Sequence, residues 1–185
     1  MIETSFPNRQ TIARGAEESA KSNHTMLAIF RLGGELLAVD ASAVQEIALM
    51  ARLSIPSGLP AVIAGFLNLA QRPIPVIRLH RLLGLPEPAL GLYTHILILY
   101  AGEGTSVGWI IDQVTTIVHV HRGELMPVPE GHCFKDCAKA VFTNNGASVC
   151  LLAPDRVLLE QEHRCVLEFQ AKEEERLREL AHAAP

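Results

Sequence analysis

The sequence lacks a long apolar run. No stretch of its 185 residues approaches the roughly 20 consecutive apolar residues that a bilayer-spanning helix needs. The residues before Asn23 also lack the apolar core of a signal peptide, and we interpret them as a polar lead-in. The net charge is −4 and Lys and Arg are not clustered, which argues against a nucleic-acid surface. The sequence predicts a soluble, cytoplasmic, globular protein with no direct membrane insertion and no nucleic-acid partner.

Catalytic motifs are also missing. The glycine-containing stretches have neither the spacing of a phosphate-binding loop nor that of a dinucleotide fingerprint, and no nucleophile elbow is present. Cys133 follows His132, but neighbours in a loop seldom point at each other, so no activated thiol is indicated. We therefore predict no catalytic residue, no cofactor and no enzymatic activity.

Four cysteines occur, all in the last third of the chain: Cys133, Cys137, Cys150 and Cys165. Without a secretory signal ahead of them, reduced thiols are expected. Zinc takes four nitrogen or sulfur ligands, so a metal-binding regulatory domain that uses His119, His121, Cys133 and Cys137 is an alternative hypothesis. The favoured interpretation is a polar strand face plus incidental loop residues, because the two histidines alternate along a strand and the cysteines lie in another loop.

Short β-rich runs separated by turn signals fill most of the chain, in which 49% of residues are hydrophobic. Gly33-Gly34 and Asn145-Gly146 each suit a two-residue hairpin turn. We count about ten strands, about five on each side of a break near residues 86–91, which is typical of barrels or sandwiches. A short helix or bend is expected after Asp40, and a helical turn ended by Gly84 after residue 79. Trp109 lies in an alternating strand and is expected in the core.

The last residues, 160–185, are rich in charge and free of turn residues, and they predict a helical tail. Three pairs are spaced to support it: Glu160 with Arg164, Glu168 with Lys172, and Glu174 with Arg178. Its apolar stripe of Val166, Phe169, Leu177 and Leu180 is interrupted by Glu173. We therefore expect a solvated helix that docks by its first turns only, with a short coiled coil as the alternative.

Four segments in a fixed order resemble the CheW family of chemotaxis coupling proteins. These are "FRLGGELLAVDASAVQEI", "LPAVIAGFLNLAQRPIPVIRL", "VGWIIDQVTTIVHV" and "SVCLLAPDRVL", and the similarity extends from about Leu27 to Leu159. The resemblance implies two five-stranded, SH3-like β-barrels that share an apolar core, plus a C-terminal α-helix. Together with the residue patterns above, it predicts a polar lead-in over 1–25, a CheW-like domain over 26–159 divided near 86–91, and a charged helical tail over 160–185.

The resemblance further implies a non-catalytic signalling adaptor. Family members couple the cytoplasmic tip of a methyl-accepting chemoreceptor to a histidine kinase of the CheA type, and they are recruited to membrane-associated receptor arrays. One surface takes the helical hairpin of the receptor, and another meets the regulatory domain of the kinase. The alternative is a diverged module that serves a different receptor-kinase system or no longer binds the kinase.

The chain departs from the family in its partner-binding loop, usually written Asn-Leu-Arg-Gly. The arginine and glycine are replaced by Ala70 and Gln71, and Arg78 replaces the aspartate after Pro-Val-Ile. Glu46 stands where the family's glutamate pairs with that arginine, so we expect Arg78, or else Arg72, to approach Glu46. The candidate partner-binding residues are Glu46, Asn68, Ala70, Gln71, Arg72 and Arg78.

Two expectations follow for this loop. Asn68 is expected mainly to satisfy backbone groups of the turn, with an interface role as the second interpretation. We expect the loop to keep its backbone structure but to present an altered binding surface. The protein should then bind a typical CheW partner weakly and prefer a partner whose acidic side chains face Arg72 and Arg78.

Overall fold

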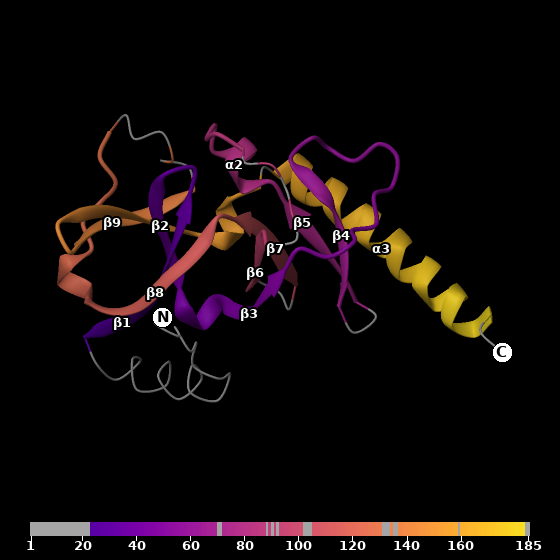
Figure 1. Cartoon of the computed structure of the whole chain (residues 1–185), viewed down its shortest axis with the longest axis horizontal. Helices are drawn as coiled ribbons and strands as arrows, with labels where there is room; N and C mark the ends of the chain where they lie inside the picture. Colours follow the sequence, from indigo (N-terminus) through magenta and orange to yellow (C-terminus); the bar gives the residue numbers. More distant parts are fainter. Residues whose placement is uncertain are drawn as a thin grey trace.

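Ten β-strands form two five-stranded sheets in the computed structural model of the chain, which describes residues 23–69, 72–87, 89, 91, 93–101, 105–130, 134, 137–158 and 160–183 (Figure 1). The strands are β1 (His24–Leu32), β2 (Glu35–Asp40), β3 (Val44–Leu49), β4 (Ile63–Leu69), β5 (Arg72–Ile77), β6 (His95–Tyr100), β7 (Ser106–Ile111), β8 (Gln113–His121), β9 (Ala138–Asn144) and β10 (Ala147–Leu152). The helices are α2 (Leu79–Leu82) and α3 (Glu160–Ala183), with 3₁₀ turns η1 (Ala41–Ala43), η2 (Arg122–Glu124) and η3 (Pro154–Arg156). The predicted fold class is confirmed, whereas the lead-in up to residue 22 lies outside the described residues.

The two sheets exchange strands between the halves of the chain. The first has the order β8-β1-β2-β10-β9 and the second the order β3-β6-β7-β5-β4. If five is added to each strand number of the first sheet, with the count returning to β1 after β10, the result is the strand order of the second sheet. The two halves of the chain are therefore related by internal pseudo-symmetry. The predicted division near 86–91 is therefore not a boundary between the sheets: it connects β5 and α2 to β6 within the second sheet.

Each sheet closes toward a barrel through one isolated bridge. Met126, in the segment after β8, pairs with Val141 of β9, and Ser54, in the segment after β3, pairs with Phe66 of β4. We call the closed sheets barrel A (β8, β1, β2, β10, β9) and barrel B (β3, β6, β7, β5, β4). Gly65 permits the closure of barrel B, because its φ is +148° and a Cβ there would lie 2.6 Å from the Ser54 carbonyl oxygen.

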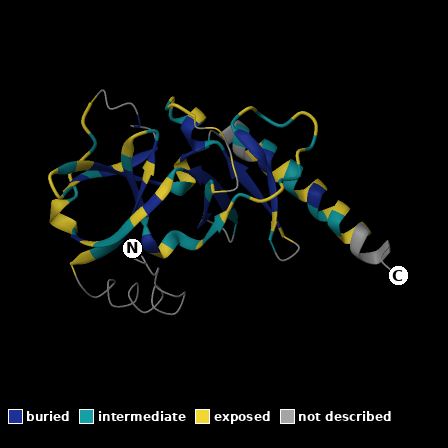
Figure 2. Cartoon of the chain, viewed as in Figure 1, coloured by how far each residue is buried: buried dark blue, intermediate teal, exposed yellow. Residues whose placement is uncertain are grey.

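Strand alternation sorts the apolar side chains into three buried clusters. Figure 2 shows that the buried residues gather in the strands. Leu27 and Ile29 point into barrel A, whereas Phe30 belongs to a seam between the barrels. Trp109, fully buried as predicted, joins that seam with its ring centroid 6.2 Å from that of Phe30. Because both faces of these strands are covered, their sequences read as continuous apolar runs.

The local turn predictions are confirmed. Gly33 and Gly34 both have positive φ between β1 and β2, as do Asn145 and Gly146 between β9 and β10. Asp40 caps η1 by accepting a hydrogen bond from the Ser42 backbone N–H at 3.0 Å. Only one turn of 3₁₀ helix follows, and the residues from Val44 onward form β3 instead.

Helix α3 docks further along its length than predicted. Glu173, which interrupts the apolar stripe, is buried, with only 9% of its side chain exposed. Its carboxylate accepts a hydrogen bond from the Ser54 hydroxyl at 3.0 Å and pairs with Arg176 at 3.3 Å. A buried carboxylate needs such partners, so the residue that seemed to break the docking face is part of it. Of the expected helix pairs, Glu174 and Arg178 lie 3.9 Å apart.

Candidate partner-binding groove

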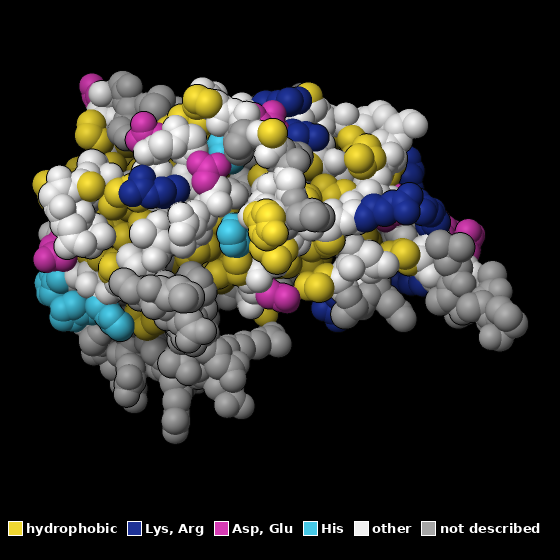
Figure 3. Space-filling view, in the orientation of Figure 1, with side chains coloured by type: hydrophobic (Ala, Val, Ile, Leu, Met, Phe, Trp, Pro, Cys, Tyr) yellow, Lys and Arg dark blue, Asp and Glu magenta, His cyan; other side chains and the backbone are white. Residues whose placement is uncertain are grey.

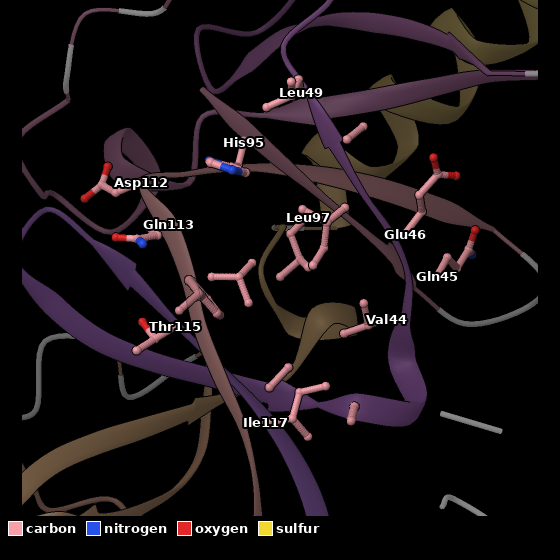
Figure 4. Close-up of a pocket in the computed structure, with 16 residues that line it drawn as sticks. Val44, Gln45, Glu46, Leu49, His95, Leu97, Asp112, Gln113, Thr115 and Ile117 are labelled. Atoms are coloured by element: carbon pink, nitrogen blue, oxygen red, sulfur yellow. The ribbon is translucent and has the colours of Figure 1, made fainter. Parts of the chain in front are cut away.

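A groove of about 630 Å³ separates the pseudo-equivalent strands β3 and β8. Each is an edge strand of its barrel, β3 pairing with β6 and β8 with β1. Every residue of β3 from Val44 to Leu49 lines the groove, and Gln113, Thr115 and Ile117 line it from β8 (Figure 4). The groove therefore lies between the two barrels, and the two halves of the chain contribute equivalent strands to it.

The floor of the groove is apolar and its rim is polar. Leu97 of β6 lies at its middle, with Val44 and Ile117 on either side (Figure 4). Gln113 and Thr115 stand along one wall. Leu49, a large apolar residue with 55% of its surface exposed, lies at the end of β3, and Figure 3 shows hydrophobic side chains at the surface between the barrels. Such a concave apolar strip with polar borders is typical of a protein-binding groove.

Hydrogen bonds hold both walls in place. Asp112, at the start of the β8 wall, accepts a hydrogen bond from the Gly33 backbone N–H at 2.7 Å and lies 2.7 Å from Nε2 of the fully buried His80. On the β3 wall, Gln45 donates to the Ser106 hydroxyl at 2.7 Å. The groove is therefore preformed, and a ligand need not order its walls.

Of the predicted site residues, Glu46 lies at this groove, on the outer side of β3 (Figure 4). It is exposed and makes no ion pair with any residue that the structure describes. The predicted approach of Arg78 or Arg72 to Glu46 is wrong. β3 and β5 are separated by β6 and β7, which places them about 14 Å apart at the usual strand spacing.

Arg78 instead pairs with Glu87. Arg78 Nη1 lies 2.8 Å from one carboxylate oxygen of Glu87, and Arg81 Nη2 lies 2.9 Å from the other. The hydrogen bond from Arg78, helped by that from Arg81, lowers the pKa of Glu87 below its ordinary value, against the opposing effect of burial. Arg78 therefore ties the residue before α2 to the connection that follows it.

Two further predicted site residues, Asn68 at the end of β4 and Arg72 at the start of β5, do not line the groove. Both are exposed, whereas Ala70 and Gln71 lie outside the described residues. The expected role of Asn68 in satisfying the turn backbone concerns residues 70 and 71, so this prediction lies outside the described residues. The predicted site thus combined Glu46, on the edge strand β3, with residues of β4 and β5 at the opposite end of the same sheet.

The histidines and cysteines of the metal hypothesis are not brought together. His119 and His121 lie on β8, whereas Cys137 is buried in the seam cluster and His132 and Cys133 fall outside the described residues. Among residues with described positions, no group of three His, Cys, Asp or Glu side chains could hold a metal ion. None of the described helices is long and apolar enough to cross a membrane.

Sequence reasoning missed the β8 wall. Gln113, Thr115 and Ile117 carry no motif, and their role depends on β8 facing β3 across the groove. The available signal was the mixture of apolar and polar side chains in "DQVTTIVHV", which differs from the uniformly apolar runs of β6 and β7 and indicates a strand with one face in solvent.

Comparison with known proteins yields one consistent family. The family model of the CheW-like domain matches residues 27–162. A chemotaxis protein CheW from Bacillus subtilis is 32% identical over 103 residues, covering 56% of this chain and 65% of that protein. A chemotaxis protein CheW from Rhizobium meliloti is 26% identical over 140 residues, covering 74% of this chain and 88% of that protein. The crystal structure of the scaffolding protein TtCheW from Thermoanaerobacter tengcongensis aligns with a TM-score of 0.69 and 19% identity, over 75% of this chain and 90% of that one.

Proposed function

Since the chain belongs to the CheW-like domain family, we propose that it is a non-catalytic chemotaxis adaptor. In this proposal it couples the cytoplasmic tip of a methyl-accepting chemoreceptor to a histidine kinase of the CheA type, in the cytoplasm at receptor arrays. The names of its relatives, chemotaxis and scaffolding proteins, support the role. An adaptor needs surfaces for its partners and no reacting groups, which agrees with a groove lined mainly by aliphatic side chains.

The groove between β3 and β8 is the proposed receptor site. Its apolar floor and polar rim suit one face of an amphipathic helix, whose apolar side chains insert at intervals of three and four residues. Of the two partners, the receptor tip is the helical one. Leu49 and Ile117 are the anchors we expect to contact it, since they present apolar surface on opposite walls.

Substitution at the groove rim tests this assignment. Leu49→Asp and Thr115→Arg each alter an exposed side chain without opening the core. Each should weaken binding of a receptor-tip hairpin by about tenfold or more, measured by calorimetric titration, because a charge then faces an apolar anchor. Thr143→Arg on the exposed face of β9 is the matched control and should bind as the parent does.

If all three variants bound the receptor-tip hairpin with equal affinity, the groove would not be the receptor site. The adaptor role as a whole is tested separately, by whether the chain forms a ternary complex with a receptor tip and a kinase regulatory domain. A protein that binds the receptor tip but never the kinase domain would instead be the diverged module that has lost its kinase.

A further inference from the structure

A second hollow, of about 560 Å³, lies between the later turns of α3 and the segment that closes barrel B. Ile55 and Leu177 form its walls, Phe66 its floor, and Arg52 and Arg176 its rim. We call it the α3 hollow. It shares no lining residue with the groove between β3 and β8, so it is a separate feature of the surface.

The buried contact of Glu173 keeps this hollow open in a fixed shape. Glu173 holds α3 to Ser54 of the closing segment through the 3.0 Å hydrogen bond, and Arg176 completes the contact from one turn further along. The folded protein is strongly destabilised when a buried, hydrogen-bonded carboxylate is deprived of its partner. The wall formed by α3 is therefore anchored at the hollow itself.

This wall lies beyond the family resemblance. The match to the CheW-like domain ends at residue 162, whereas Glu173, Arg176 and Leu177 belong to the later part of α3. The hollow combines the closing segment and β4 of the family domain with a helical wall outside the matched region. It is consequently a feature of this chain that the matched domain does not include.

The lining of the hollow mixes apolar side chains with polar ones, among them two arginines and the buried carboxylate of Glu173. Ile55, 71% exposed, is the most exposed of the large aliphatic residues that the structure describes. Arg52 makes no ion pair with any described residue, whereas Arg176, whose side chain is 59% exposed, pairs with Glu173 at 3.3 Å. Lys and Arg side chains gather on the side of the molecule where α3 lies (Figure 3), although the chain as a whole carries a charge of −4.

We propose that the α3 hollow is a second docking site, for an acidic segment of a partner protein. A large apolar side chain of that segment would pack against Ile55, Phe66 and Leu177, and its carboxylates would face Arg52 and Arg176. Asn68, exposed and part of the lining of the hollow, is placed to bind the backbone of the segment. The site extends beyond the adaptor function proposed above and uses none of the groove residues.

Titration with a defined peptide probe tests the proposal on the full chain. The probe is a short, labelled peptide in which Leu and Phe alternate with pairs of Glu, and its counterpart has Lys in place of Glu. We expect the acidic peptide to bind by fluorescence anisotropy and to shift the amide NMR signals of residues 52–55, of β4 and of α3. Arg52→Glu should weaken binding by about tenfold or more, since it reverses a charge at the rim, and Ile55→Ser should weaken it as well.

The controls separate this site from charge effects elsewhere. Arg31→Glu makes the same charge change at an exposed position of β1 and should leave affinity within about twofold. Leu49→Asp, which disables the proposed receptor groove, should also leave it unchanged. Melting temperatures near that of the parent establish that each variant is folded. The proposal is overturned if the acidic peptide does not bind, if Arg52→Glu binds it equally well, or if its NMR shifts map to the β3–β8 groove.

Discussion

At the scale of the residue, Glu87 is held by two arginines, Arg78 and Arg81. Because the folded-state pKa of Glu87 is lowered, this carboxylate adds stability above its ordinary pKa of 4.5 and loses it as the pH falls through the lowered value. Glu87→Gln should reduce the free energy of unfolding by about 0.5–1 kcal/mol near neutral pH, for a partly exposed pair. At pH 3 this difference should be smaller than near neutral pH, because Glu87 loses its charge as the pH falls through the lowered pKa.

Urea unfolding at both pH values measures this difference. Glu35→Gln, at an exposed position without an ion pair among described residues, is the control and should show no such pH-dependent difference. If Glu87→Gln lowered the free energy of unfolding by the same amount at both pH values, the side chain would act through packing and not through its charge.

The contact between Ser54 and Glu173 is the other residue-scale determinant. Ser54→Ala removes the hydroxyl donor from a buried carboxylate and should lower the free energy of unfolding by about 1–2 kcal/mol. Ser57→Ala, an identical substitution at an exposed turn position three residues away, should change it by less than about 0.5 kcal/mol. Equal thermal stability of the two variants would mean that solvent satisfies Glu173 as well as Ser54 does.

At the scale of the element, the connection between β4 and β5 is where the sequence predicts a departure of this chain from its family. The charge-assisted contact of the missing arginine should be worth about 2–5 kcal/mol of binding, a factor of about thirty or more. We expect the parent to bind a typical receptor-tip and kinase-domain pair weakly, and the double variant Ala70→Arg with Gln71→Gly to bind it more tightly by that factor. Ser148→Arg, which adds a charge on exposed β10, should not improve binding. Tight binding by the parent itself would show that the departures are neutral.

The positions of strands and turns could be predicted from the sequence far better than which strands lie side by side. Hairpins at Gly33-Gly34 and Asn145-Gly146 are set by local backbone preferences, and β-rich runs are set by side-chain alternation. Which strands lie side by side depends on packing between distant segments, and no single run encodes it. For that reason Glu46 and Arg78 were predicted to approach each other although two strands lie between theirs. The groove was missed for the same reason, since its walls come from opposite halves of the chain.

At the scale of the whole molecule, each barrel is built from both halves of the chain. Barrel A takes β1 and β2 from the first half and β8, β9 and β10 from the second, and barrel B takes the reciprocal set. Fragments 1–88 and 89–185 should therefore each be unfolded alone and should fold together when mixed, because neither can close a barrel or bury the seam. Circular dichroism and amide NMR spectra of the separate and mixed fragments measure this. Cooperative unfolding of either fragment by itself would contradict it.

The exchange of strands also sets an order of events during synthesis on the ribosome. All strands of barrel B lie between Val44 and Ile111, so this barrel can close while the last third of the chain is still being made. The hairpin of β1 and β2 emerges first but finds its neighbours last, since β8 and β10 end only at His121 and Leu152. Throughout that interval its apolar faces and both its edges are without partners, which is the condition that favours aggregation of nascent chains and their capture by chaperones. Of the ten strands, the two that leave the ribosome first are thus the ones that need protection for longest.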